Sequence, residues 1–179
     1  MTRTIIRNAV ESDRKRIRAI CFDAFDKAEN EAVANLACDL LTEGSTPPTI
    51  NLAAETDGDL VGNVAFSPVW RQLDKALAGY ILAPLAVSPA WQNRGVGSTL
   101  VREGLRQVER LGARVALVYG DPAYYARFGF AIGPAERFEA PYPLKYPNGW
   151  QAMELNGGPA SGFGGPIECV KALSRPELW

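Results

Sequence analysis

An apolar run followed by a glycine-rich loop and an amphipathic helix constrains the fold of this chain most strongly. The run covers Tyr80–Val87, and its lack of alternation is typical of a strand buried on both faces. Apolar residues recur at helical spacing from Ser98 to about Leu111, and Arg114–Tyr119 has the pattern of a second strand. A strand, a helix and a strand with short connections predict a βαβ unit with parallel strands. The helix residues expected to face inward are Leu100, Val101, Leu105, Val108 and Leu111.

Pro84 interrupts the apolar run. Proline has no N–H and cannot donate a hydrogen bond within a sheet. We therefore expect a β-bulge at this residue, or a point at which strand pairing stops.

Helical and strand patterns also lie on both sides of this unit. Ser12 is placed as the N-cap of a first helix, and Asp57-Gly58 between two strand-like runs predicts a hairpin turn. Gly129 is expected to end a short helix over 121–128 in the left-handed conformation. The other expected elements are a strand over 4–8, a helix over 31–41, hairpin strands over 49–55 and 60–66, and late strands near 151–155 and 167–172. No repeat or linker is found, which predicts one mixed α/β domain over residues 1–179.

Composition excludes several classes of chemistry and partner. The chain contains no histidine, so Ser-His-Asp and Cys-His nucleophiles and histidine-ligated zinc are excluded. Its net charge of -1 argues against nucleic acid as a partner. No apolar run has the roughly 20 residues of a membrane span, the start lacks a signal-peptide segment, and the three cysteines are widely spaced. We expect a cytoplasmic protein with no membrane partner and no metal.

The glycine-rich loop predicts an anion-binding site. Gly95 and Gly97 lie directly before the helix, where free amides and the positive end of the helix dipole favour a negatively charged group. Arg94 adds a formal positive charge, so a pyrophosphate is a suitable ligand. The alternative is a simple turn that starts the helix.

Two nucleotide-binding motifs fit this loop poorly. A P-loop needs a lysine after its last glycine, and none follows Gly97. A dinucleotide fingerprint needs glycine or alanine at the position of Leu100. Asp121 lies where a ribose-binding acid would stand, so a nicotinamide-dependent oxidoreductase remains an alternative.

Three segments together resemble the GNAT superfamily of N-acetyltransferases. They are Leu85–Val87, the loop Gln92–Gly97, and the sequence GDPAYYARFGF over Gly120–Phe130. The resemblance implies a GNAT fold, an α/β (α+β) architecture with a central mixed, mostly antiparallel sheet splayed by a β-bulge and helices on both faces. It also implies transfer of an acetyl group from acetyl-CoA to a primary amine by direct attack in a ternary complex.

The resemblance further implies a site for the cosubstrate in the gap between the splayed strands. Backbone groups of Leu85 and Val87 would bind pantetheine, the amides from Asn93 to Ser98 would hold the pyrophosphate, and Gln92 and Arg94 would position the loop or contact phosphate. The full set of implied binding residues is Leu85, Ala86, Val87, Gln92, Asn93, Arg94, Gly95, Val96, Gly97 and Ser98.

The same resemblance places the general acid at Tyr125, four residues before Gly129. A phenol is a credible proton donor to a departing thiolate, and the adjacent Tyr124 is the second candidate. A backbone amide near Leu85 or Ala86 would stabilise the oxyanion. Some relatives carry a glutamate base where Ile81 stands, so the base here is left open among Glu55, Asp121 and a chain of water molecules.

Several alternatives accompany this interpretation. A cysteine could act as a covalent nucleophile, at Cys21, Cys38 or Cys169. A non-catalytic acyl-CoA sensor would keep the loop without the transfer, and the basic run over 14–18 could bind RNA. Part of 137–148 could wall the acceptor site. The acceptor, a small-molecule or peptide amine, is not readable from the sequence, and a homodimer is possible because dimers are common in the family.

Overall fold

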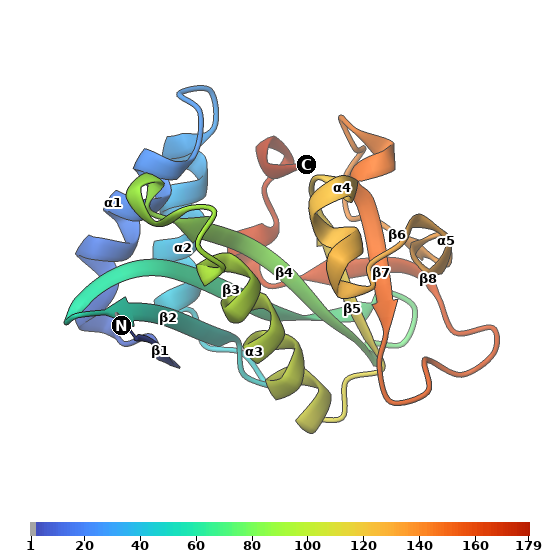
Figure 1. Ribbon diagram of the computed structural model, residues 1–179. Helices are drawn as coiled ribbons and strands as arrows, with labels where there is room; N and C mark the ends of the chain where they lie inside the picture. The colour runs from blue at the N-terminus through green and yellow to red at the C-terminus, as the bar shows by residue number, and fades with distance from the viewer. Residues whose placement is uncertain (1–2) are drawn as a thin grey trace.

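The computed structural model describes residues 3–179 and shows a twisted sheet with helices on both faces (Figure 1). The strands are β1 (Thr4–Asn8), β2 (Ile50–Thr56), β3 (Asp59–Arg71), β4 (Leu77–Val87), β5 (Val115–Tyr119), β6 (Phe138–Glu139), β7 (Trp150–Glu154) and β8 (Gly165–Cys169). The main path runs β1-β2-β3-β4-β5-β7, and β8 pairs with both β3 and β6. The β4–β5 and β6–β8 pairs are parallel and the other pairs are antiparallel. The expected mixed, mostly antiparallel sheet is confirmed.

The α-helices cover opposite faces of this sheet. They are α1 (Arg14–Ala24), α2 (Asn30–Thr42), α3 (Val96–Arg110), α4 (Pro122–Tyr125) and α5 (Ile132–Ala135). Neighbouring residues of β3 point to opposite faces, as the period of a strand requires. Phe66 packs with Leu100 of α3, whereas Ala65 packs with Leu36 of α2. Two apolar layers therefore sandwich the sheet.

The bulge expected at Pro84 is present in β4. Leu82 and Leu85 pair with β3 residues that are only two positions apart, Phe66 and Val64, so Ala83–Pro84 oppose a single residue. An extra residue on one strand is the definition of a β-bulge. In the parallel pairing of β4 with β5, Tyr80–Leu82 pair with residues 116–118. Within the described residues, no later residue of β4 pairs with β5. The two strands separate where the bulge begins.

The bulge also shifts which side chains face which layer. Leu82 and Leu85 both pack on the α3 side, although they are three positions apart. Ala83 and Ala86 pack on the side of α1 and α2. The segment of β4 beyond the bulge therefore presents residues to both sides of the gap.

Several expected boundaries were wrong. Ser12 is not an N-cap, because a 3-10 turn over 11–13 precedes α1, and Asp13 accepts the Val10 amide and pairs with Arg7 of β1. Leu111 is 47% exposed because α3 ends one residue before it.

Other expected elements differ in extent. The second hairpin strand, expected over 60–66, continues to Arg71 because β8 gives its far end a further partner. The late strand ends at Cys169, because the amides of Lys171 and Ala172 donate to the Glu43 carboxylate instead of to a strand. The helix expected over 121–128 divides into α4 and a 3-10 turn, and Gly129 ends it at φ 101° as expected.

Candidate functional site

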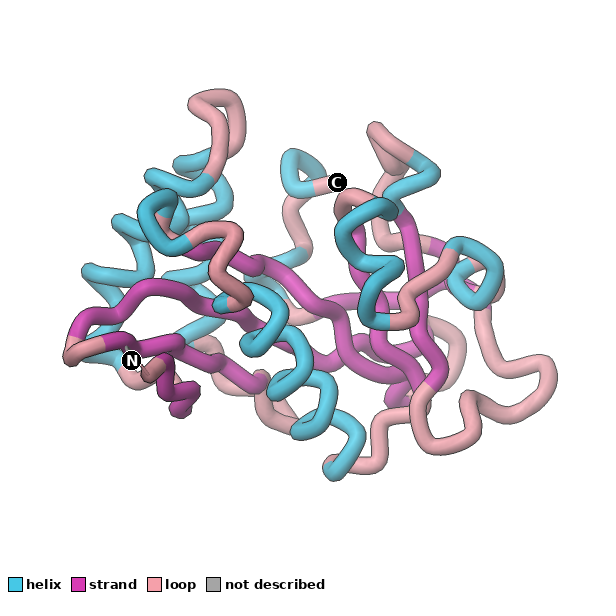
Figure 2. Tube along the Cα trace, in the orientation of Figure 1, coloured by secondary structure: helices cyan, strands magenta, loops and turns pink. Residues whose placement is uncertain are grey.

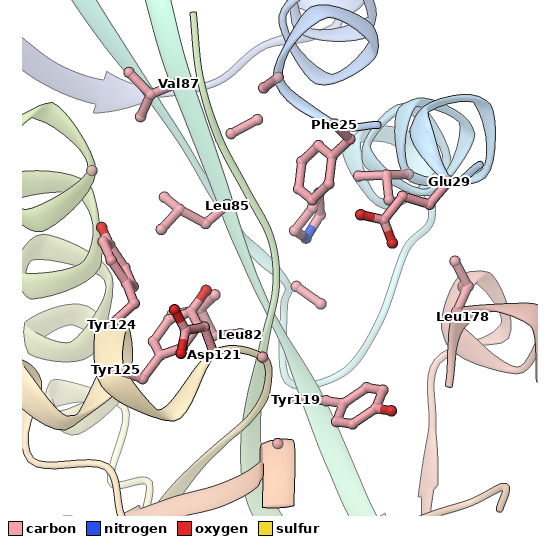
Figure 3. Close-up of a pocket in the computed structure, with 18 of the residues that line it drawn as sticks. Phe25, Glu29, Leu82, Leu85, Val87, Tyr119, Asp121, Tyr124, Tyr125 and Leu178 are labelled. Atoms are coloured by element: carbon pink, nitrogen blue, oxygen red, sulfur yellow. The ribbon is translucent and has the colours of Figure 1, made fainter. Parts of the chain in front are cut away.

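A large cavity opens where β4 and β5 separate. Its volume is about 1330 Å³, and it is lined by both faces of the bulged part of β4. One half is bounded by the loop before α3 and by α4, and the other by the α1–α2 connection and the C-terminal turn. Figure 3 shows side chains from both halves directed into the same space, and in Figure 2 the C-terminal turn stands between the α1–α2 connection and α4. The cavity can therefore receive two reactants from opposite faces of the sheet.

The loop before α3 is held against the end of β4. The side-chain amide of Gln92 donates to the Val87 carbonyl over 3.0 Å. Asn93 and Gly95 adopt positive φ angles of 60° and 82°, a conformation for which glycine and asparagine are suited. These two residues turn the chain sharply into the helix.

The start of α3 presents backbone donors to the cavity. The amide of Thr99 is the first to donate within the helix, to the Gly95 carbonyl over 3.0 Å. The amides of Val96, Gly97 and Ser98 precede it, and such first-turn amides have no intrahelical acceptor. Together with the helix dipole they form a site for an anion.

Most of the residues implied by the resemblance line this cavity, namely Leu85, Ala86, Val87, Gln92, Asn93, Gly95, Gly97, Ser98, Tyr124 and Tyr125. Two others are placed differently. The Val96 side chain is buried under α3. The Arg94 guanidinium lies 5.0 Å from the centroid of the Trp91 ring. Neither residue is among those that line the cavity, although Val96 is the first residue of α3.

Tyr124 lies directly over the start of α3. A β-carbon added to Gly97 would lie 2.7 Å from the Tyr124 Oη atom. Burial raises the pKa of this phenol, and nearby Arg127 and Ser98 oppose that shift. The Arg127 guanidinium lies 4.5 Å from the Tyr124 ring centroid. Tyr124 thus forms part of the wall next to the amide donors.

Tyr125 occupies the junction between β5 and α4. Its ring covers Gly120, where an added β-carbon would lie 2.6 Å from Cε2. It packs edge-on against Phe130 and Tyr124, with centroid separations of 5.8 and 5.0 Å. Burial raises its pKa well above the ordinary value, and Tyr124 and Asp121 raise it further. The phenol therefore keeps its proton at neutral pH, and Tyr125 lines the cavity.

The acids considered as general bases are placed very differently. Glu55 lies on β2, where its carboxylate accepts from Arg7 Nε over 2.8 Å, and it is not among the residues that line the cavity. Asp121 does line the cavity, but one of its oxygens caps α4 by accepting the Ala123 amide over 2.9 Å. Ile81, which stands at the position of the missing glutamate, also lines it. Glu55 is therefore excluded as a base by its position.

Sequence reasoning missed the residues that close the far half of the cavity. Glu29 enters from the α1–α2 connection, and Glu177, Leu178 and Trp179 enter from the end of the chain. The Trp179 ring stacks on Tyr119 with centroids 6.1 Å apart. No spacing in the sequence connects these segments, so no local signal could have identified them.

Part of the segment 137–148, which was expected to wall the acceptor site, lines the cavity. Lys145, Tyr146 and Asn148 line the cavity, and the Tyr146 amide donates to the Tyr119 Oη atom over 2.7 Å. This hydrogen bond attaches the segment to the end of β5.

The cysteines are poorly suited to nucleophilic chemistry. Burial raises the pKa of Cys21 and of Cys169 to about 12 in each case. Neither residue lines the cavity, and neither does Cys38. A thiol that stays protonated is a weak nucleophile, so the covalent alternative finds no support at this site.

Within residues 3–179 there is no cluster of three or more cysteine, aspartate or glutamate side chains arranged to hold a metal ion. No helix in the same range has both the length and the apolar character needed to cross a membrane.

Comparison with known proteins gives consistent results. The model of the acetyltransferase (GNAT) family matches residues 14–130. The chain is 32% identical over 165 residues to the uncharacterized N-acetyltransferase YjhQ of Escherichia coli K12. The aligned region covers 89% of this chain and 88% of that protein. It is 35% identical over 140 residues to the uncharacterized N-acetyltransferase YhbS of the same strain, covering 78% and 80%.

Two solved structures resemble the whole fold. The crystal structure of YhbS from Escherichia coli in complex with CoA superposes with a TM-score of 0.79 at 30% identity, over 98% of this chain and 94% of that one. A GNAT family acetyltransferase from Brucella melitensis in complex with acetyl-CoA gives a TM-score of 0.66 at 32% identity, over 95% and 97%.

Proposed function

Because the chain belongs to the GNAT family of acetyltransferases, we propose that it transfers an acetyl group from acetyl-CoA to a primary amine held in the same cavity. One observation carries the proposal: the amide-lined start of α3 and the protonated Tyr125 phenol border a single cavity at the gap between β4 and β5. The complexes of YhbS with CoA and of the Brucella protein with acetyl-CoA support the choice of cosubstrate.

The half of the cavity next to α3 suits the cosubstrate. The amides of residues 93–98 would hold its pyrophosphate, with Gln92 fixing the loop. The unpaired edge of β4 at Leu85 to Val87 would bind the pantetheine amides in the manner of an added strand. Gly97 suits this role because a side chain there would enter the space between Tyr124 and β4.

The chemical step is a direct transfer between two bound substrates. The lone pair of a neutral amine forms the new C–N bond with the thioester carbonyl carbon, and the C–S bond breaks. Tyr125 gives its phenolic proton to the departing sulfur, and a backbone amide at Leu85 or Ala86 faces the oxygen that gains negative charge. The proton lost by the amine nitrogen leaves through water or Asp121. Holding both reactants in one cavity supplies much of the acceleration.

The test measures binding and turnover separately. Calorimetry should detect CoA binding, and release of free thiol from acetyl-CoA should depend on an added primary amine. Tyr125→Phe should lower kcat by about 100-fold or more, as loss of a general acid does, with little change in the Kd for CoA. Tyr124→Phe in the same assay decides between the two tyrosines. Absence of CoA binding refutes the proposal, and CoA binding with no turnover on any amine favours the non-catalytic sensor.

A further inference from the structure

The half of the cavity that faces α1 and α2 is apolar at its floor and acidic at its walls. Phe25, Leu36 and Ile81 contribute apolar surface. The acidic side chains lining this half are Asp26, Glu29 and Glu177, and the single basic one is Lys145. The excess of acids is confined to this half, because the α3 side contributes one acid, Asp121, and one base, Arg127.

Glu29 and Glu177 border this half of the cavity from two segments that are far apart in the chain. Glu29 lies where the chain enters α2, and Figure 3 shows its carboxylate directed into the cavity, with Leu178 on the same side of the view. Glu177 precedes Leu178 in the C-terminal turn. Among the hydrogen bonds and ion pairs found within residues 3–179, none involves either carboxylate. Both charges are therefore available to a ligand.

The basic residue of this half is placed apart from these acids. The Lys145 Nζ atom lies 5.3 Å from the centroid of the neighbouring Tyr146 ring. No ion pair of Lys145 is recorded within the described residues. The acidic character of the far half is thus not neutralised inside the protein.

We propose that the acceptor is a linear aliphatic amine with a second positive charge at its far end, which the carboxylates of Glu29 and Glu177 attract. This inference rests on the proposed function and specifies its substrate class. The reacting nitrogen must lie near Tyr125, and an apolar spacer fits the floor formed by Phe25, Leu36 and Ile81. The second ammonium then lies at the acidic walls, where a terminal carboxylate would be repelled.

Three probes of equal length test this directly. Pentylamine, 1,5-diaminopentane and 5-aminopentanoate share the reacting amine and the spacer, and differ only in a neutral, cationic or anionic far end. Their dissociation constants are measured by calorimetry on the protein saturated with CoA, so that no turnover is required. We expect the diamine to bind about tenfold more tightly than pentylamine, since each exposed carboxylate contributes up to about 1 kcal/mol. 5-Aminopentanoate should bind most weakly.

Charge-removing variants assign the preference to a residue. Glu29→Gln should reduce the advantage of the diamine over pentylamine by about threefold to fivefold and leave pentylamine binding unchanged. Glu31→Gln is the matched control, because Glu31 lies in the first turn of the same helix, is exposed and does not line the cavity. Raising the salt to roughly 0.5 M, at which exposed charges are strongly screened, should shrink the same advantage.

Each result separates the inference from the proposed function. The inference would be overturned if the three probes bind equally, if 5-aminopentanoate binds more tightly, or if no probe binds. It would also be overturned if Glu29→Gln and Glu31→Gln have equal effects. Tight diamine binding without acetylation would support the acidic recognition site and refute the transferase instead. Absence of CoA binding would refute the proposed function through a measurement that does not involve the acids.

Discussion

Replacing Gly97 by alanine tests the amide-lined start of α3 with a single methyl group. The added carbon would lie 2.7 Å from Tyr124 Oη, 3.6 Å from Val87 Cγ2 and 3.9 Å from Leu85 Cδ2. Ordinary contact begins at 3.4 Å, so the hydroxyl must move by about 0.7 Å, which the end of a side chain can do. Gly97 has a helical backbone without positive φ, so alanine should raise the helix stability by up to about 1 kcal/mol.

The same methyl group should weaken binding of the cosubstrate. It would project into the space that the pyrophosphate needs in order to reach the Gly97 amide. Loss of one hydrogen bond to a charged group costs about 1.5–3 kcal/mol, which is roughly 10- to 100-fold in the Kd for CoA. Calorimetry with CoA measures this change, and thermal or urea unfolding measures the stability.

Gly133→Ala is the matched control for Gly97→Ala. Gly133 also lies in a helix, and an added β-carbon there meets nothing within 4 Å. Its variant should retain the CoA affinity of the unmodified chain. If Gly97→Ala binds CoA as tightly as Gly133→Ala does, the start of α3 does not hold the pyrophosphate and the reasoning fails.

Three further predictions concern stability and reactivity. Gly104→Ala should lower the free energy of unfolding by about 2 kcal/mol, because the new β-carbon overlaps the buried Phe66 ring; an unchanged urea midpoint would contradict this packing. Arg7 donates to both oxygens of Asp13 and lowers the pKa of that carboxyl. The stabilisation is therefore present above about pH 4 and is lost as the pH falls through the lower folded pKa. Asp13→Asn should lower the free energy of unfolding by about 1 kcal/mol at pH 7 and should make stability fall less steeply at acid pH. Parallel stability profiles of the two proteins would show that the Arg7–Asp13 pair does not stabilise the fold. Burial raises the pKa of Cys21 to about 12, so this thiol should resist alkylation at pH 8 in the folded state. Mass spectrometry can compare the extent of Cys21 alkylation with and without denaturant.

Local chemistry made several parts of the fold predictable. Pro84 lacks an N–H, and the bulge in β4 lies there. Asp57 and Gly58 favour left-handed backbone angles, and both adopt them in the hairpin turn. Gly129 ends its helical segment in the same conformation. Each of these predictions depends on one or two adjacent residues, and tertiary packing did not override them.

Element boundaries depended on partners that belong to other elements or segments. The N-cap expected at Ser12 was replaced by an arrangement in which Asp13 meets Arg7 of β1. The end of β8 was set by Glu43, which accepts two amides of the segment that follows the strand. Propensity within a window of residues contains no information about such partners.

The sequence by itself indicated the half of the candidate site to which we assign the cosubstrate, because the glycine loop, the helix start and Tyr125 lie within one continuous stretch of chain. The tertiary structure alone decided which residues form the half to which we assign the acceptor. It placed Glu55 beside Arg7 and away from the cavity, and it brought Glu29 and Glu177 to the lining of one cavity. The physical reason is that long-range packing of α1, α2 and the C-terminal turn on the sheet, and not local backbone preference, sets which distant charges share a space.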